Sequence, residues 1–158
     1  MKKFLGLLVL VIVVCGAVLS QPTLEIALYR AYMSQPQGAF PVIGNIYSVG
    51  ATDISSHIIV TDEGLILLDA GTVPMSSMLK ENIETLGHEI TDVKYIISSH
   101  AHWDHVEGLA HMQVMTGAQV IALAEDAVAI ASGIDSSAYG GVGWEPVAVD
   151  MIIKDTEI

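Results

Sequence analysis

A histidine-rich hexapeptide directly after a short apolar run is the feature that most restricts the fold of this chain. The hexapeptide reads His100-Ala101-His102-Trp103-Asp104-His105, so it holds three histidines and one carboxylate. The apolar run before it, Val93–Ile97, has the length and composition of a buried strand. The residues after it, Val106–Thr116, have the pattern of a helix that Gly117 closes. The polar loop therefore leaves the C-terminal end of a strand, which is where α/β sheets tend to place their chemistry.

The spacing inside the hexapeptide suits metal ions. His100 and His102 are two residues apart, so in an extended chain they project from the same side and can hold one ion. Asp104 and His105 are adjacent on a turning chain and can face a second ion. Imidazole and carboxylate donors suit zinc best, with iron or manganese as alternatives. Two ions roughly 3.5–4 Å apart would share a bridging water and lower its pKa to about 7; a polar turn that is histidine-rich by chance is the other interpretation.

The hexapeptide resembles the HxHxDH signature of the metallo-β-lactamase superfamily. Three earlier stretches also resemble the opening of a true metallo-β-lactamase: Gly44–Gly50, Asp53–Ile59 and Gly64–Gly71. They are most similar to the subclass in which histidines hold the first zinc and no cysteine is a ligand. The similarity runs from about Phe40 to Ile158, which is most of the chain.

The resemblance implies an α/β fold, the four-layer αββα sandwich, which is built from two similar halves. This chain resembles the first half. The family completes each zinc site with one more histidine much later in its sequence, whereas the last histidine here is His111. We therefore expect a fragment of a longer enzyme, with an apolar sheet face left exposed. A homodimer that rebuilds the sandwich and an inactive relic are the alternatives.

The resemblance also assigns roles to the hexapeptide. His100 and His102 would hold the first zinc ion, and Asp104 and His105 would help to hold the second. Asp104 would also orient the nucleophile, which makes it the expected catalytic residue. Zinc is therefore the implied cofactor, as one or two ions, with two expected in the complete enzyme.

Three further residues are candidates for supporting roles. Asp69 ends an apolar run, and in the family its equivalent is a buried carboxylate that holds the metal loop. A simple turn residue at a strand end is the alternative for Asp69. Trp103, between the ligands, and Tyr32, in a poorly patterned stretch, are weaker candidates for the substrate rim, with ordinary packing as their alternative.

The reaction that the resemblance implies is hydrolysis of the β-lactam amide of antibiotics. A metal-bound hydroxide would attack the strained carbonyl, so no serine nucleophile is expected, and the partner would be a small-molecule β-lactam. The first alternative is a lactonase or thioesterase of the same fold. The second is a non-catalytic metal-binding half-domain.

The N-terminal segment Met1–Ser20 has the features of a secretory signal peptide. Two lysines precede an apolar stretch, Phe4–Val14, that is too short for a comfortable membrane span. We expect cleavage after Ser20, with a cut after Ala17 as the alternative. A lipid anchor at Cys15 and an uncleaved membrane anchor are further alternatives.

Residues 21–158 are expected to form one domain, the N-terminal part of a metallo-β-lactamase domain. Six basic and 18 acidic residues give the chain a formal charge of −12, which argues against nucleic acid or an anionic membrane as partners. Cys15 is the only cysteine, so the mature chain would have neither a disulfide nor a thiolate ligand. We expect a periplasmic or secreted bacterial protein, without stable membrane association after signal removal, and an oligomer if the half-fold is real.

Hydropathy patterns predict the remaining elements. We expect three antiparallel strands over Val42–Val49, Ser55–Thr61 and Leu65–Asp69, with a turn that ends at Gly64. Helices are expected over Leu24–Met33, Thr72–Leu86 and Glu125–Ser132, and a further strand over Gln119–Ala122. The apolar face of the second helix would consist of Met75, Met78, Leu79, Ile83 and Leu86. Gly133–Gly143 is expected to be a mobile loop, and His57, His88 and His111 are expected to have structural or solvated positions.

Overall fold

The computed structural model describes residue 25, residues 27–135 and residues 143–154. The chain divides into two compact units, residues 1–33 and residues 34–158. In the first unit, residue 25 and residues 27–33 are helical, which agrees with the helix expected over Leu24–Met33. The expected signal segment Met1–Ser20 and most of the expected mobile loop Gly133–Gly143 lie outside the described residues. Among the helices that the structure does describe, none is long and apolar enough to cross a membrane.

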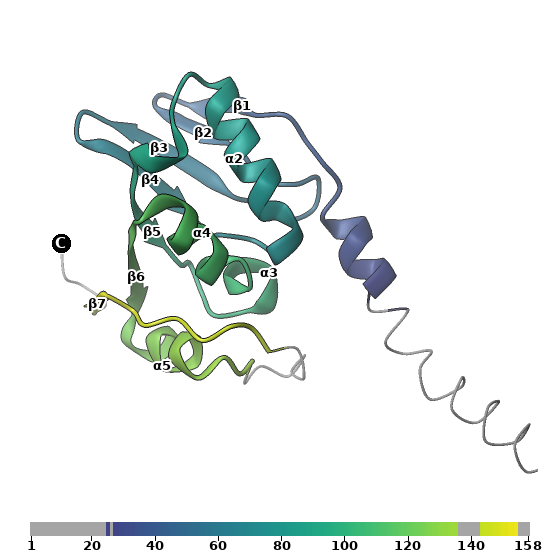
Figure 1. The fold of residues 1–158 in the computed structure, drawn as a ribbon, viewed down its shortest axis with the longest axis vertical. Helices are drawn as coiled ribbons and strands as arrows, with labels where there is room; N and C mark the ends of the chain where they lie inside the picture. The colour runs from purple at the N-terminus through teal and green to yellow at the C-terminus, as the bar shows by residue number, and fades with distance from the viewer. Residues whose placement is uncertain (1–24, 26, 136–142, 155–158) are drawn as a thin grey trace, which may run out of the picture. The chain divides into compact units, whose positions relative to one another are not determined.

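Within its described residues, the second unit is built on one seven-stranded sheet whose strands lie in sequence order (Figure 1). The strands are β1 (Phe40–Ile43), β2 (Ile46–Ser48), β3 (His57–Thr61), β4 (Gly64–Leu68), β5 (Val93–Ile97), β6 (Gln119–Leu123) and β7 (Met151–Ile153). Neighbouring strands from β1 to β4 are antiparallel, and those from β4 to β7 are parallel. The parallel pairing puts the C-terminal ends of β4, β5 and β6 at the same edge of the sheet.

Helical segments connect the parallel strands. Between β4 and β5 lie η1 (Val73–Met75), α2 (Ser76–Thr85) and η2 (Ile90–Asp92), and between β5 and β6 lie α3 (Trp103–Val106) and α4 (Leu109–Thr116). The helix α5 (Ala124–Ser132) follows β6 and contacts both β6 and β7. In Figure 1, α2 and α4 lie over one face of the sheet. The core is on that side, where Leu67, Ile96 and Val120 of adjacent strands are fully buried.

The opposite face of the sheet carries apolar side chains that are only half-buried. In β4, β5 and β6 the residues that alternate with the buried ones are Ile66, Leu68, Tyr95, Ile97, Ile121 and Leu123. Successive strand residues point to opposite faces, so these six side chains share one face. An apolar, exposed sheet face is expected from the sequence; this face is apolar, and its side chains are half-buried.

The prediction of a single strand over Val42–Val49 is wrong. This stretch contains the second half of β1, a turn and then β2, because the chain reverses at Gly44 and Asn45. Gly44 has a φ of +56°, in the left-handed region that glycine adopts without steric cost. The Asn45 side chain donates a hydrogen bond to the Val60 carbonyl at 2.6 Å, which ties the turn to β3. Apolar residues flank the turn on both sides and hide it in the hydropathy pattern.

The prediction of one helix over Val106–Thr116 is also wrong at its start. A separate turn, α3, ends at Val106, and α4 begins only at Leu109. Between them, the N–H of Gly108 donates to the Gly71 carbonyl at 2.8 Å. A contact with a distant part of the chain therefore interrupts the helix, and nothing in the local pattern marks it.

Most other predicted elements are present within a few residues of their expected bounds. Gly64 has a φ of +127°, as expected for the end of the β3–β4 turn. The helix predicted over Thr72–Leu86 begins with the 3₁₀ turn η1 and continues as α2. Its predicted apolar face is confirmed at Met75, Leu79 and Ile83, which are buried. The fold is thus mixed α/β, as expected, and it brings the end of β4 next to the loop after β5.

Candidate metal centre

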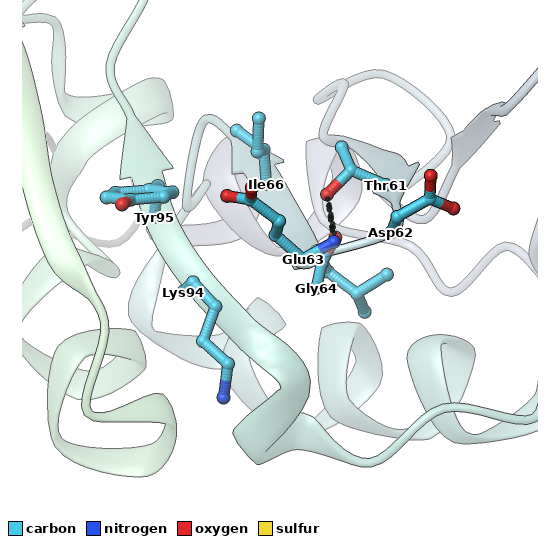
Figure 2. Close-up of a pocket in the computed structure, with 8 residues that line it drawn as sticks. Thr61, Asp62, Glu63, Gly64, Ile66, Lys94 and Tyr95 are labelled. Atoms are coloured by element: carbon cyan, nitrogen blue, oxygen red, sulfur yellow. Dashed lines mark hydrogen bonds between the residues drawn. The ribbon is translucent and has the colours of Figure 1, made fainter.

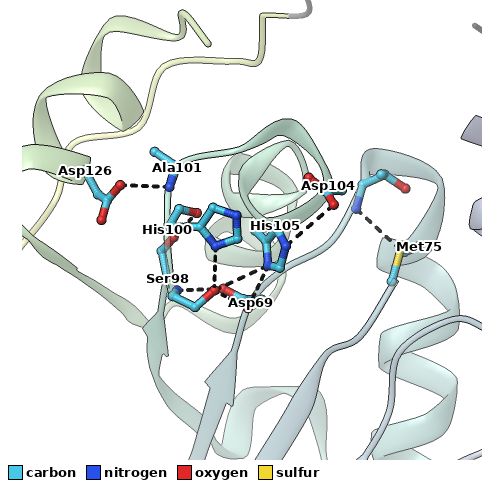
Figure 3. A network of polar contacts seen from close by, with 10 residues as sticks. Asp69, Met75, Ser98, His100, Ala101, Asp104, His105 and Asp126 are labelled. Atoms are coloured by element: carbon cyan, nitrogen blue, oxygen red, sulfur yellow. Dashed lines mark hydrogen bonds and ion pairs between the residues drawn. The ribbon is translucent and has the colours of Figure 1, made fainter. Parts of the chain in front are cut away.

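The hexapeptide follows the C-terminal end of β5, beside the end of β4 (Figure 3). Its first three residues lie in the loop after β5, and its last three begin α3. The N–H of Asp69 donates to the Ile97 carbonyl at 2.9 Å, which continues the β4–β5 pairing by one residue. The N–H of Ser98 donates to the Ile121 carbonyl of β6 at 3.0 Å. Three parallel strands therefore fix the start of the loop, and the predicted strand-end location is confirmed.

Asp69 is the buried acceptor at the centre of this network. Its side chain accepts hydrogen bonds from the Ser99 N–H at 2.7 Å, the Ser99 hydroxyl at 2.7 Å and the His105 Nδ1–H at 2.8 Å. The backbone of Asp69 has a φ of +60°, and no other described non-glycine residue has a positive φ. Aspartate tolerates this region better than most residues, yet the conformation carries a cost that the surrounding contacts must offset.

These contacts set the tautomers of two imidazoles. An ionised carboxylate can only accept, so Nδ1 of His105 carries the proton that it donates to Asp69. The single hydroxyl proton of Ser99 goes to Asp69, so the Ser99 oxygen accepts from the His100 Nδ1–H at 3.1 Å. In their neutral forms both rings then have an unprotonated Nε2, the form in which histidine binds a metal.

The four predicted ligands lie close together. The ring centroid of His100 is 4.5 Å from that of His102 and 4.0 Å from that of His105. Nε2 of His105 lies 3.5 Å from a carboxylate oxygen of Asp104. All four side chains are half-buried, so they remain open to solvent on one side.

The pKa values of His100 and His105, the two imidazoles whose tautomers are set, shift in opposite directions. Burial and the positive charges of His105 and His102 lower the pKa of His100, which favours a neutral ring. Burial lowers the pKa of His105, but the hydrogen bond and charge of Asp69 and the charge of Asp104 outweigh it, and the net pKa is raised. Burial raises the pKa of Asp69, but its hydrogen bonds from His105 and Ser99 outweigh it, and the net pKa is lowered.

Two residues of the network were missed in the sequence. No role is predicted for Ser99, although a hydroxyl directly before the first histidine is a signal for one. Asp126, in the first turn of α5, accepts a hydrogen bond from the Ala101 N–H at 2.9 Å (Figure 3). Nothing distinguishes Asp126 in the sequence from an ordinary acidic residue at a helix start.

The donor chemistry of the loop fits zinc. Neutral imidazoles with a free Nε2 and a nearby carboxylate are typical zinc ligands. Among the residues that the structure describes, however, no group of three or more His, Cys, Asp or Glu side chains is placed to hold an ion. The loop thus brings donors together without completing a three-donor site, and the roles of His100, His102, Asp104, His105 and Asp69 stay predictions.

The two rim candidates have different positions in the chain. Trp103 begins α3 and is half-buried. Tyr32 is 66% exposed and belongs to the first unit, residues 1–33. Neither position tests a contact with substrate, so both assignments stay predictions.

A surface hollow of about 370 Å³ lies at the β3–β4 turn and is lined by Thr61–Ile66, Lys94 and Tyr95 (Figure 2). The N–H of Glu63 donates to the Thr61 hydroxyl at 3.2 Å within the turn. This hollow is at the starting ends of β4 and β5, whereas the hexapeptide follows the C-terminal end of β5. It is therefore separate from the candidate metal centre.

A family model described as the metallo-beta-lactamase superfamily matches residues 49–157. The matched region includes Asp69, the whole hexapeptide and Asp126. It covers more than half of the chain and nearly all of the second unit.

The chain is also similar to solved structures of metallo-beta-lactamases. A Cronobacter sakazakii protein with a HARLDQ motif is 34% identical, with a TM-score of 0.76, and the match covers 80% of this chain and 50% of that one. BJP-1, a subclass B3 enzyme of Bradyrhizobium japonicum, is 35% identical, with a TM-score of 0.70 and coverage of 77% and 47%. LRA-12, a class B3 di-zinc enzyme from an Alaskan soil metagenome, is 34% identical, with a TM-score of 0.73 and coverage of 78% and 48%. The chain spans about half the length of these solved structures.

Proposed function

The chain belongs to the metallo-beta-lactamase superfamily, and from that premise we propose that its activity is zinc-dependent hydrolysis of the β-lactam amide of antibiotics. One observation carries the proposal: the Asp69–Ser99 pair holds two imidazoles of the loop with Nδ1 protonated and Nε2 free. This is the arrangement in which supporting carboxylates prepare histidines as metal ligands. The similarity to subclass B3 enzymes at 34–35% identity supports the β-lactam substrate.

In this proposal the hexapeptide residues are the ligands. His100 and His102 hold one zinc ion, and Asp104 and His105 contribute to a second. Zinc, when bound, polarises a carbonyl and lowers the pKa of water. Asp104 orients the attacking water toward the strained carbonyl of the substrate.

Asp69 and Ser99 prepare the ligands for this role. Because the pKa of His105 is raised, its ring must lose the Nε2 proton before it can bind zinc, and the Nδ1 proton stays with Asp69. His100 has a lowered pKa and needs no such change near neutral pH. The carboxylate of Asp69 thus fixes the orientation of the His105 ring, and Nε2 is the nitrogen that would hold a metal.

We also propose that the protein acts outside the cytoplasm. Met1–Ser20 has the charged start and the apolar stretch of a signal peptide. Export to a bacterial periplasm or to the medium would bring the protein to β-lactams before they reach their targets.

Hydrolysis assays with two substrates test the proposed function. We expect the 158-residue chain with zinc to hydrolyse a carbapenem only slowly, because its last histidine is His111 and the family completes each zinc site with a later one. The turnover should be abolished by EDTA and restored by zinc. His100→Ala should abolish turnover, whereas His111→Ala, at an exposed position of α4, should not change it. Turnover of an acyl lactone but not of the carbapenem would contradict the β-lactam assignment. Bound zinc without any EDTA-sensitive turnover would instead favour a non-catalytic metal-binding protein.

A further inference from the structure

We propose that Asp126 is a positioning residue that fixes the backbone between His100 and His102 for metal binding. This inference rests on the proposed metal function, and it assigns a role to a residue outside the hexapeptide. It concerns the geometry of the loop rather than a direct contact with the metal.

The hydrogen bond between Ala101 and Asp126 joins two segments that follow different strands of the sheet. Asp126 lies in the first turn of α5, which follows β6, while Ala101 lies in the loop after β5. The Ala101 N–H donates to Oδ1 of Asp126 at 2.9 Å. Ala101 is 8% exposed, so its amide needs a partner within the protein. Asp126 supplies that partner from α5, which follows a different strand from the loop that contains Ala101.

A second carboxylate holds the amide on the other side of His100. Oδ1 of Asp69 accepts from the Ser99 N–H at 2.7 Å, two residues before Ala101. The amides that precede and follow His100 are therefore both fixed, one by the end of β4 and one by α5. Neither hydrogen bond uses an imidazole, so the chain direction through His100 is set before any ligand binds.

The fixed backbone explains why His100 and His102 lie together. His102 has extended dihedral angles, φ −108° and ψ 154°, and directly precedes α3. The ring centroids of His100 and His102 are 4.5 Å apart. If the Ala101 amide lost its acceptor, the peptide between the two histidines could rotate and separate the rings.

A geometric role and a charge effect predict opposite results for two conservative variants. Asp126→Asn removes the charge but keeps a carbonyl oxygen that can accept the Ala101 N–H. Asp126→Glu keeps the charge but displaces the acceptor by one methylene. The exposed Glu125, next to Asp126 in the same helical turn, provides a matched control as Glu125→Gln, which removes the same charge.

The first measurement is amide hydrogen exchange in the metal-free 158-residue chain. We expect the Ala101 amide of Asp126→Glu to exchange about tenfold faster than in the unchanged protein, and that of Asp126→Asn to stay within about threefold. Amides of Leu67 and Ile96 in the core should be unchanged, which shows that the fold is intact. Unchanged exchange of Ala101 in Asp126→Glu would overturn the proposal, whether or not the protein binds metal.

The second measurement is the affinity for Co²⁺, followed by its visible absorption as a spectroscopic substitute for zinc. Loss of a residue that supports metal ligands typically weakens metal binding 10–100-fold, so we expect at least about a tenfold loss in Asp126→Glu. Asp126→Asn and Glu125→Gln should bind nearly as the unchanged protein does. Equal losses in Asp126→Asn and Glu125→Gln, with none in Asp126→Glu, would show a charge effect and overturn the proposal. An unchanged protein that binds no Co²⁺ would contradict the proposed function, while the exchange experiment would still decide the role of Asp126.

Discussion

Ser99 shows how a small side chain can set the chemistry of its neighbour. Its hydroxyl gives its proton to Asp69, which leaves the oxygen as an acceptor for Nδ1–H of His100. Isolated histidine side chains exchange between two neutral tautomers, so a fixed acceptor at Nδ1 selects the one with a free Nε2. The same carboxylate selects the same tautomer in His105.

We predict that Ser99→Ala releases the tautomer of His100. Without the serine oxygen, the ring should shift toward protonation at Nε2, and loss of the hydrogen bonds should cost about 1 kcal/mol of folding stability. Long-range ¹H–¹⁵N correlation spectra of the metal-free protein report which ring nitrogen carries the proton. The exposed His111 serves as an internal control. A His100 ring that is protonated at Nε2 already in the unchanged protein would contradict the assignment.

The Asp69–His105 pair should give the metal-free protein a characteristic dependence of stability on pH. The pKa of Asp69 is lowered in the folded state, so its contribution is present above its unfolded value of about 3.9 and is lost as the pH falls through the folded value. The pKa of His105 is raised, so its contribution is complete below its unfolded value of about 6.5 and is lost as the pH rises through the folded value. The pair should therefore stabilise the fold most between about pH 4 and 6.5.

Urea unfolding across the pH range, with a chelator present, measures this effect. Asp69→Asn is the suitable variant because asparagine also tolerates a positive φ, such as the +60° found here. We expect the variant to lose the extra stability between about pH 4 and 6.5, so that its curve is flatter. Parallel curves for the two proteins would show that the pair does not contribute.

At the level of elements, hydrogen bonds between the segment after β4 and the α3–α4 junction hold the hexapeptide in place. The N–H of Ala70 donates to the His105 carbonyl at 3.0 Å, and the N–H of Gly108 donates to the Gly71 carbonyl at 2.8 Å. The segment that follows β4 is therefore bonded to both ends of the α3–α4 junction. This close approach requires a residue without a side chain at position 108.

We predict that Gly108→Ala destabilises the fold by about 1–3 kcal/mol, the range for overpacking a tight site. A Cβ at this position would lie 2.5 Å from the Ala70 carbonyl oxygen and 3.1 Å from that of Thr72, and backbone atoms cannot move aside as a flexible side chain can. Urea unfolding measures the loss of stability. Gly38→Ala is the control, because nothing lies within 4 Å of a Cβ at residue 38. An equal effect of the two substitutions would refute the crowding argument.

For the whole molecule, the division into two units gives a prediction about folding. Residues 34–158 contain every strand that the structure describes, and they form a compact unit with its own buried core. Units of this kind generally can fold alone. Residues 1–33 should therefore not be required for the fold of the second unit.

Removal of residues 1–33 should leave the second unit folded, with a thermal midpoint within a few degrees of the longer chain. The measurement is thermal unfolding together with the amide spectrum of both proteins. The Ser34–Thr72 hydroxyl contact, at 3.1 Å, is retained because the cut falls before Ser34. Loss of the dispersed amide signals on truncation would show that the first unit is needed for folding.

The local sequence pattern determined much of this protein by itself. Runs such as Gly64–Leu68 bury alternate residues, so their hydropathy alone predicts strands. The hexapeptide contains its donors within six residues, so its metal chemistry can be inferred without knowing what surrounds it. The local pattern does not predict the turn at Gly44 or the interruption between α3 and α4 at Gly108. Apolar residues continue on both sides of each position, so the hydropathy does not mark it.

Only the tertiary structure decided how the donors are held. Asp69 is 30 residues before Ser99 and Asp126 is 25 residues after Ala101, and these pairs meet only because β4, β5 and β6 are parallel neighbours. A pattern along one segment contains no information about which distant carboxylate will accept a given amide or imidazole proton. Residue types therefore indicate which metal would suit the hexapeptide, whereas the sheet topology sets which ring nitrogen of His100 and of His105 carries the proton.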